Sequence, residues 1–173
     1  IAPFAQYDSK VYPLDLMQEV INQLAKKEDY QLFLFGGGHD EIEKLNTLAQ
    51  SAENVKVIAG KLTFRHELEL ISNLDVMLSM DSGNGHIAAM YGVNVFTLFG
   101  ATHPYAGFQP FGQPFENAIV SDRNQYPKLP TSVYGNKNVE GYEEAMRTIS
   151  PEAVVKAVQS QLTDTNRQLT TDN

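Results

Sequence analysis

The residues best suited to chemistry form one short run, Asp81-Ser82-Gly83-Asn84-Gly85-His86. The run follows an apolar strand pattern over 76–80 and precedes a short helical pattern over 87–91 that ends at Gly92. A helix start exposes unpaired N–H groups and the positive end of the helix dipole, and small residues let an anion approach them. The run therefore predicts a phosphate-type site, to which His86 could add a donor. An N-cap with glycines for a tight turn fits the same residues, and both interpretations stay open.

A second glycine-rich run, Gly36-Gly37-Gly38, also lies between a strand pattern and a helix pattern. It has neither the G-x-G-x-x-G spacing of a dinucleotide site nor the following G-K-[ST] of a P-loop, so a tight turn is favoured. Asp40 and Glu41, just beyond it, could accept hydrogen bonds from a ribose, as an acidic residue does in many nucleotide folds. Acidic residues also suit any helix N-terminus, so a purely structural role stays open.

Other catalytic arrangements fail on spacing. Ser82 is not a nucleophile elbow, because Met80 and Asn84 stand where G-x-S-x-G needs glycine. His66-Glu67 does not begin an H-E-x-x-H zinc motif, because Leu70 occupies the second histidine position. The four histidines are scattered and cysteine is absent, so we expect no metal ion, no disulfide and no other cofactor.

Composition bounds the class of protein. The chain has 173 residues, of which 42% are hydrophobic and 20% charged, as expected for one globular domain with a substantial core. The net charge of −8 argues against a general nucleic-acid surface, because phosphate backbones require clustered positive charge. No apolar run approaches the roughly 20 residues of a membrane span. The absence of cysteine fits a reducing cytoplasm.

The elements that must position these residues follow an alternating pattern. Short apolar runs alternate with helix-period segments, which predicts an α/β domain with a Rossmann-like, doubly wound parallel sheet. The expected strands are 1–5, 31–35, 55–58, 76–80, 93–99 and 118–120. Between them we expect helices with inward-facing Leu14, Met17, Val20, Ile21, Leu24, Ile42, Leu45, Leu48, Ala49, Leu68 and Ile71.

The alternation of strand and helix patterns ends near Gly100. Residues 101–138 contain most of the prolines and several glycines and aromatics, which indicates a long ordered loop. A last helix is expected from Pro151, with Ser150 as its N-cap. We expect the domain to span residues 1–162 and the polar stretch 163–173 to be a disordered tail. Since the chain opens in a strand pattern with no basic segment before it, we expect no signal peptide and an excised domain whose N-terminal neighbour is missing.

Several segments, in this order, resemble glycosyltransferase family 9, the heptosyltransferases of lipopolysaccharide core synthesis. The resemblance covers roughly residues 1–162. It rests on Ser9-Lys10-Val11-Tyr12-Pro13, Gly60-Lys61-Leu62-Thr63, Glu67-Leu68-Glu69-Leu70-Ile71, Leu74-Asp75, Asp81-Ser82-Gly83-x-x-His86-x-Ala88-Ala89, Gly92-Val93, Leu98-Phe99-Gly100-x-Thr102-x-Pro104 and Ile149-Ser150-Pro151-Glu152-x-Val154.

The resemblance implies the C-terminal half of a GT-B fold, in which two Rossmann-like domains face a cleft. That half binds the nucleotide-sugar donor, here ADP-heptose, and an inverting displacement follows at the anomeric carbon. The general base and the lipid A-core acceptor belong to the N-terminal domain, so this fragment contains no catalytic residue and should be inactive by itself. The implied location is cytoplasmic, with the full-length enzyme peripheral at the inner membrane.

The resemblance also implies residue roles. Lys10 would neutralise the donor diphosphate, and Gln6 would line the same loop. Ser82, Gly83 and neighbouring amides would cradle that diphosphate. The remaining implied contacts are Asp81 ordering the turn, His86 nearby, Leu62 packing on the base, and Asp40 or Glu41 reaching the ribose.

Two alternatives stay open. A GT-B-fold sugar-nucleotide epimerase or phosphorylase would need additional site residues that we cannot locate. A non-catalytic module that binds nucleotide-sugars would keep the fold without the chemistry, although the intact Lys10 and Asp81-Ser82-Gly83 argue against such decay.

Overall fold

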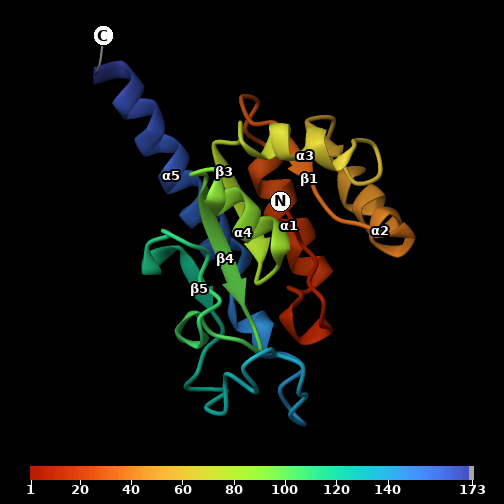
Figure 1. The fold of residues 1–173 in the computed structure, drawn as a ribbon, viewed down its shortest axis with the longest axis vertical. Coiled ribbons are helices and arrows are strands. Elements are labelled where there is room, and N and C mark those ends of the chain that lie inside the picture. The colour runs from red at the N-terminus through yellow and green to blue at the C-terminus, as the bar shows by residue number, and fades with distance from the viewer. Residues whose placement is uncertain (172–173) are drawn as a thin grey trace.

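The structure, a computed structural model, describes residues 1–171 and the side chains of residues 1–162. At its centre lie parallel strands with helices on both sides (Figure 1). Strand β1 (Leu32–Leu34) pairs with β2 (Val55–Val57), and β3 (Val76–Met80) pairs with β4 (Asn94–Phe99), which pairs with β5 (Ala118–Val120). The five strands predicted between residues 31 and 120 are therefore confirmed, with ends that shift by one residue or less.

The first two residues join these two groups of strands into one sheet. The Phe35 N–H donates to the Ile1 carbonyl at 2.9 Å, and the Ala2 N–H donates to the Leu78 carbonyl at 2.9 Å. The order across the sheet is therefore β2, β1, the N-terminal segment, β3, β4, β5. This order is that of a doubly wound Rossmann-type sheet, and it confirms the predicted fold class.

The predicted strand over residues 1–5 is wrong in its length. Only Ala2 forms a bridge, with Ser79 of β3. Pro3 has no N–H to donate to a neighbouring strand, so the ladder stops where the sequence places the proline.

Helices cover both faces of the sheet. On one face lie α1 (Leu14–Ala25), α2 (His39–Ala49) and α5 (Pro151–Thr171), and on the other lie α3 (Phe64–Ile71) and α4 (Gly83–Met90). The first face packs around Met17, Val20, Ile21, Leu24, Leu45, Leu48, Val154, Val155 and Val158, and the second around Ile71, Ala88 and Ala89. None of the helices within residues 1–171 is long and apolar enough to span a membrane.

Helix α5 continues to Thr171 and so includes most of the stretch from residue 163 that we expected to be a disordered tail. Neither glycine nor proline occurs between residues 163 and 171, so nothing in the sequence interrupts the helical hydrogen bonds. Residues 172–173 lie outside the described part of the chain.

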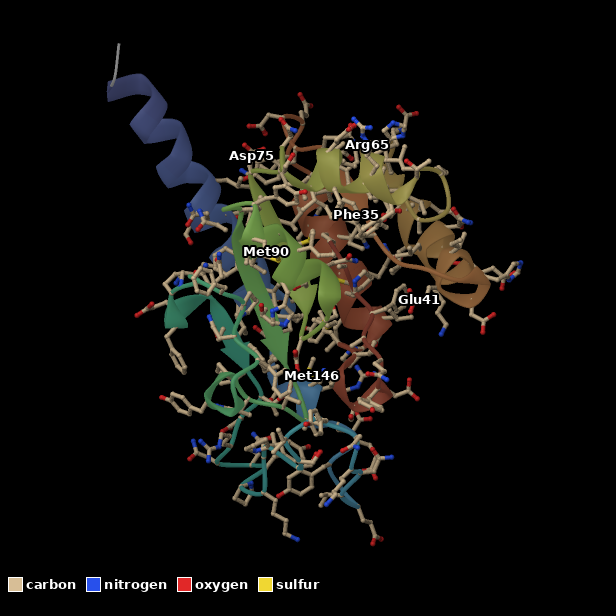
Figure 2. The ribbon with its side chains drawn as sticks, viewed as in Figure 1. Phe35, Glu41, Arg65, Asp75, Met90 and Met146 are labelled. Atoms are coloured by element: carbon tan, nitrogen blue, oxygen red, sulfur yellow. The ribbon has the colours of Figure 1, made fainter. Side chains whose placement is uncertain are left out.

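The long connections lie at the end of the sheet toward which β4 points, at the bottom of Figure 1. They contain the 3-10 helices η1 (Asp8–Lys10), η2 (Pro104–Ala106) and η4 (Ala145–Thr148), whereas η3 (Phe115–Asn117) directly precedes β5. Figure 2 places Met146 at this end and Asp75, just before β3, at the opposite end. Residues that follow β3 and β4 therefore lie beside the loops after residues 5 and 128, at the carboxyl end of the strands.

Helix α4 begins at Gly83, four residues before the position that the helical pattern predicted. Its third residue, Gly85, packs directly on β3, where an added Cβ would lie 2.3 Å from the Ser79 Oγ. A side chain at residue 85 would therefore push the start of α4 away from the sheet, so the glycine sets the depth at which this helix lies.

We expect Gly85→Ala to destabilise the chain by about 1–3 kcal/mol, because the added methyl overpacks a buried contact. Gly83→Ala is the matched control, since an added Cβ at Gly83 meets nothing within 4 Å. Thermal unfolding of the two variants tests this packing. Equal melting temperatures would contradict it.

Candidate functional site

A groove of about 320 Å³ opens at the carboxyl end of the strands, between the N-terminal segment, β1 and the start of α4. It lies at the point where the strand order reverses, which is where doubly wound sheets bind their ligands. Figure 2 shows two of its lining residues, Phe35 and Glu41, below α3. The lining consists of Ala2, Phe4, Ala5, Gln6, Phe35, Gly36, Gly37, Glu41, Glu67, Ser82, Gly83 and Asn84.

The start of α4 provides the anion-binding feature of the groove. Ser82 is the N-cap residue, with φ −153° and ψ 168°, but its side chain makes no capping hydrogen bond. Its hydroxyl oxygen is buried and has no hydrogen-bond partner among the described residues. The first N–H groups of a helix have no partner inside the helix, so an anion placed here would find several donors and the positive end of the dipole.

A buried ion pair stands next to this helix start. The Lys10 Nζ lies 2.9 Å from the Asp81 Oδ2, and the two residues are 8% and 3% exposed. The Thr102 hydroxyl donates to the same Asp81 oxygen at 2.8 Å. Two buried charges are stable only when they pair closely and satisfy their remaining hydrogen bonds. Asp81 therefore ties η1 and the segment after β4 to the end of β3.

The loop around Gly135 covers the ion pair. Gly135 has φ +71°, and an added Cβ would lie 2.9 Å from both the Lys10 Cδ and the Thr102 Cγ2. The Ser9 hydroxyl donates to the Gly135 carbonyl, which holds this loop against η1. The Phe108 ring centroid lies 5.6 Å from the Lys10 Nζ and adds a cation–π contact.

The structure separates the two acidic residues that the sequence left as alternatives for a ribose contact. Glu41 lines the groove, and its Oε2 accepts a hydrogen bond from the Gly37 N–H at 2.7 Å. Asp40 is exposed in the first turn of α2 and is not part of the lining. Leu62, expected at the base, is 38% exposed in the loop after β2 and also lies outside the lining.

The remaining predicted residues divide in the same way. Gln6, Ser82 and Gly83 line the groove. His86 is half-buried in the first turn of α4, and neither it nor Lys10 contributes to the lining. No group of three or more His, Cys, Asp or Glu side chains suited to a metal ion occurs among the described residues.

Sequence reasoning missed three residues around the site. Thr102 and Gly135 hold and cover the ion pair, and Glu67 lines the groove from α3. Thr102 and Glu67 belong to segments that carried the family resemblance, and this was the only signal for them. No pattern near Gly135 indicated a contact with residues so distant in the chain.

His103, next to Thr102, is buried and serves as an N-cap. Its Nδ1 accepts a hydrogen bond from the Tyr105 N–H at 3.3 Å. Burial, followed by the nearby positive charge of Arg123, lowers the pKa of His103 below its ordinary value. The imidazole is therefore neutral at pH 7, which keeps Nδ1 available as an acceptor.

The fold and the groove define a Rossmann-like α/β domain with its candidate ligand site at the switch point of the sheet. Residues 1–139 match the model of glycosyltransferase family 9 (heptosyltransferase). The chain belongs to this family. It is similar to lipopolysaccharide heptosyltransferase 3 of Escherichia coli K12, with 28% identity over 165 residues, which are 94% of this chain and 45% of that protein.

Solved structures agree on the fold. The chain superposes on Escherichia coli ADP-heptose lipopolysaccharide heptosyltransferase II with a TM-score of 0.69 and 23% identity, covering 95% of this chain and 46% of that one. It superposes on an Escherichia coli heptosyltransferase determined with ADP with a TM-score of 0.68 and 19% identity, covering 92% and 42%. The chain therefore spans about half the length of its relatives, and its fold corresponds to about half of a GT-B heptosyltransferase.

We expect Lys10→Met and Asp81→Asn each to destabilise the chain strongly, by about 3–5 kcal/mol, because each leaves a buried partner without compensation. The double variant should cost clearly less than the sum of the two single variants. Urea unfolding of the three variants measures this coupling.

Asp15→Asn is the matched control, because Asp15 pairs with Arg147 at 2.7 Å but its side chain is 60% exposed. Exposed pairs contribute little, so this change should be far milder. If the loss of unfolding free energy in the double variant equals the sum of the losses in the Lys10 and Asp81 single variants, the buried pair does not act as a unit.

Proposed function

We propose that the chain is the C-terminal, donor-binding domain of an inverting heptosyltransferase that acts in lipopolysaccharide core biosynthesis. The proposed donor is ADP-heptose, and the acceptor is a lipid A-core saccharide bound by an N-terminal domain outside this chain. The single observation that carries the proposal is the uncapped start of α4, which opens into a groove at the switch point of the sheet. Family membership supports the choice of donor, as do the similar ADP-heptose heptosyltransferase and the heptosyltransferase determined with ADP.

Each part of the donor has a matching part of the site. The N–H groups at the start of α4 and the Ser82 hydroxyl donate to the diphosphate. The Lys10 ammonium, paired with Asp81 next to the start of α4 and outside the groove lining, adds positive charge that stabilises the diphosphate as negative charge develops on it. Glu41 accepts from the ribose, and the loop containing Leu62 packs on the base.

The proposed reaction is a displacement at the anomeric carbon of the heptose. A base in the N-terminal domain removes the proton of the acceptor hydroxyl, the new glycosidic bond forms, and the bond to the ADP oxygen breaks with inversion. The residues of this chain bind the donor and stabilise the departing ADP. In this proposal the enzyme is cytoplasmic and peripheral at the inner membrane.

We expect the chain to bind ADP more tightly than UDP or GDP in calorimetry. Ser82→Ala should weaken ADP binding by about fivefold to tenfold, the value of one hydrogen bond, and leave adenosine binding unchanged. Ser160→Ala is the control, since the Ser160 hydroxyl donates to the Ala157 carbonyl on α5, away from the groove. Tighter binding of UDP or GDP would exclude ADP-heptose as the donor.

We also expect the isolated chain to transfer no heptose to a lipid A-core acceptor, because the proposed base and acceptor cleft lie outside it. A radiolabel or mass-spectrometric transfer assay with ADP-heptose tests this. Turnover near ordinary enzyme rates, about 1–10³ per second, would show that this half contains its own base.

A further inference from the structure

The groove contains a second carboxylate that the proposed donor contacts do not use. Glu67 lies in the first turn of α3, faces the groove that Ser82 and Gly83 also line, and is half-buried. Its side chain has no hydrogen bond or ion pair with any of the described residues. No Lys, Arg or His among the described residues lines the groove, so no cation there compensates this charge.

The neighbouring acidic side chains show why Glu67 is unusual. Glu41, across the groove, is held by the Gly37 N–H at 2.7 Å. Glu69, on the same helix, is exposed and pairs with Arg65 at 3.1 Å. Burial raises the pKa of Glu67 above its ordinary value, so the ionised side chain is disfavoured where it stands. Groups whose pKa is shifted inside a cleft are candidates for contact with a ligand, and Glu67 also lines the groove.

We infer that Glu67 is a specificity-determining residue of the donor groove, whose carboxylate accepts a hydrogen bond from a neutral N–H or O–H group of the nucleoside. The inference rests on the proposed function. A carboxylate repels phosphate, so the diphosphate belongs at Ser82 and Gly83 and the nucleoside belongs beside Glu67. Glu67 also follows Leu62 closely in the connection from β2 into α3, where the base is expected.

Whether Glu67→Gln weakens or strengthens ADP binding shows whether the carboxylate binds the nucleoside or only repels the diphosphate. Glu67→Gln removes the negative charge and keeps the size of the side chain. If the carboxylate accepts a hydrogen bond, the variant should bind ADP and adenosine about tenfold more weakly, because a charge-assisted bond is replaced by a neutral one. If the carboxylate only repels the diphosphate, the variant should bind ADP more tightly. Glu69→Gln, the matched control on the same helix, should bind both ligands as the unmodified chain does.

Two analogues locate the hydrogen-bond donor on the nucleoside. Inosine diphosphate replaces the adenine amine by a carbonyl, and 2′-deoxy-ADP lacks one ribose hydroxyl. If an analogue lacks the group that Glu67 recognises, it should bind the unmodified chain more weakly than ADP does, and the Glu67→Gln variant should bind it with that same weak affinity. The other analogue should bind the Glu67→Gln variant more weakly than the unmodified chain, by the same factor as ADP.

If Glu67 had a structural role instead, its substitution would change the stability of the ligand-free chain. The ligand-free melting temperature of Glu67→Gln at pH 7.5 should be equal to or higher than that of the unmodified chain, because the substitution removes an ionised carboxylate that burial disfavours. A lower melting temperature together with weaker binding would overturn the inference in favour of a structural role. Unchanged or tighter ADP binding would also overturn it and leave the proposed function standing. If the unmodified chain binds no ADP, both proposals fail.

Discussion

The buried ion pair between Lys10 and Asp81 is the interaction on which the arrangement of the site depends. It joins η1 to the end of β3, and the Thr102 hydroxyl adds the segment after β4 at the same carboxylate oxygen. The loop containing Gly135 then lies on top of the pair. Since an isolated charge in this position would cost several kcal/mol, these four segments are stable only when all are in place.

The same pair sets the surroundings of the groove. Asp81 directly precedes Ser82, so the atoms that hold Lys10 also hold the start of α4. Gly85 fixes the depth of that helix against Ser79 of β3. The helix start is therefore rigid before any ligand arrives, which is the condition under which fixed N–H groups stabilise an anion most effectively.

Patterns of local origin predicted most of the fold but only part of the site. The apolar runs located β1 to β5, because such runs reflect burial within a parallel sheet, whereas the strand over 1–5 was too long because Pro3 ends the pairing. Between Asp40 and Glu41 no local pattern could choose, since both fit a helix N-terminus and only the packed structure turns Glu41 toward Gly37. Asp81 was expected to order its own turn, and its bond to Lys10 was not foreseen, because pairing between distant residues leaves no periodic signal.

The polarity of the groove argues for a ligand that is charged at one end only. The start of α4 offers N–H donors and the positive end of a dipole, whereas Glu41 and Glu67 offer acceptors on the facing elements. Inorganic diphosphate would satisfy the first feature and be repelled by the second. A nucleoside diphosphate satisfies both, because its phosphates are anionic and its ribose and base present neutral hydroxyl and amine donors. Selectivity for the nucleotide over free phosphate therefore follows from the opposite polarity of the two sides, and it requires no lysine or arginine in the groove lining.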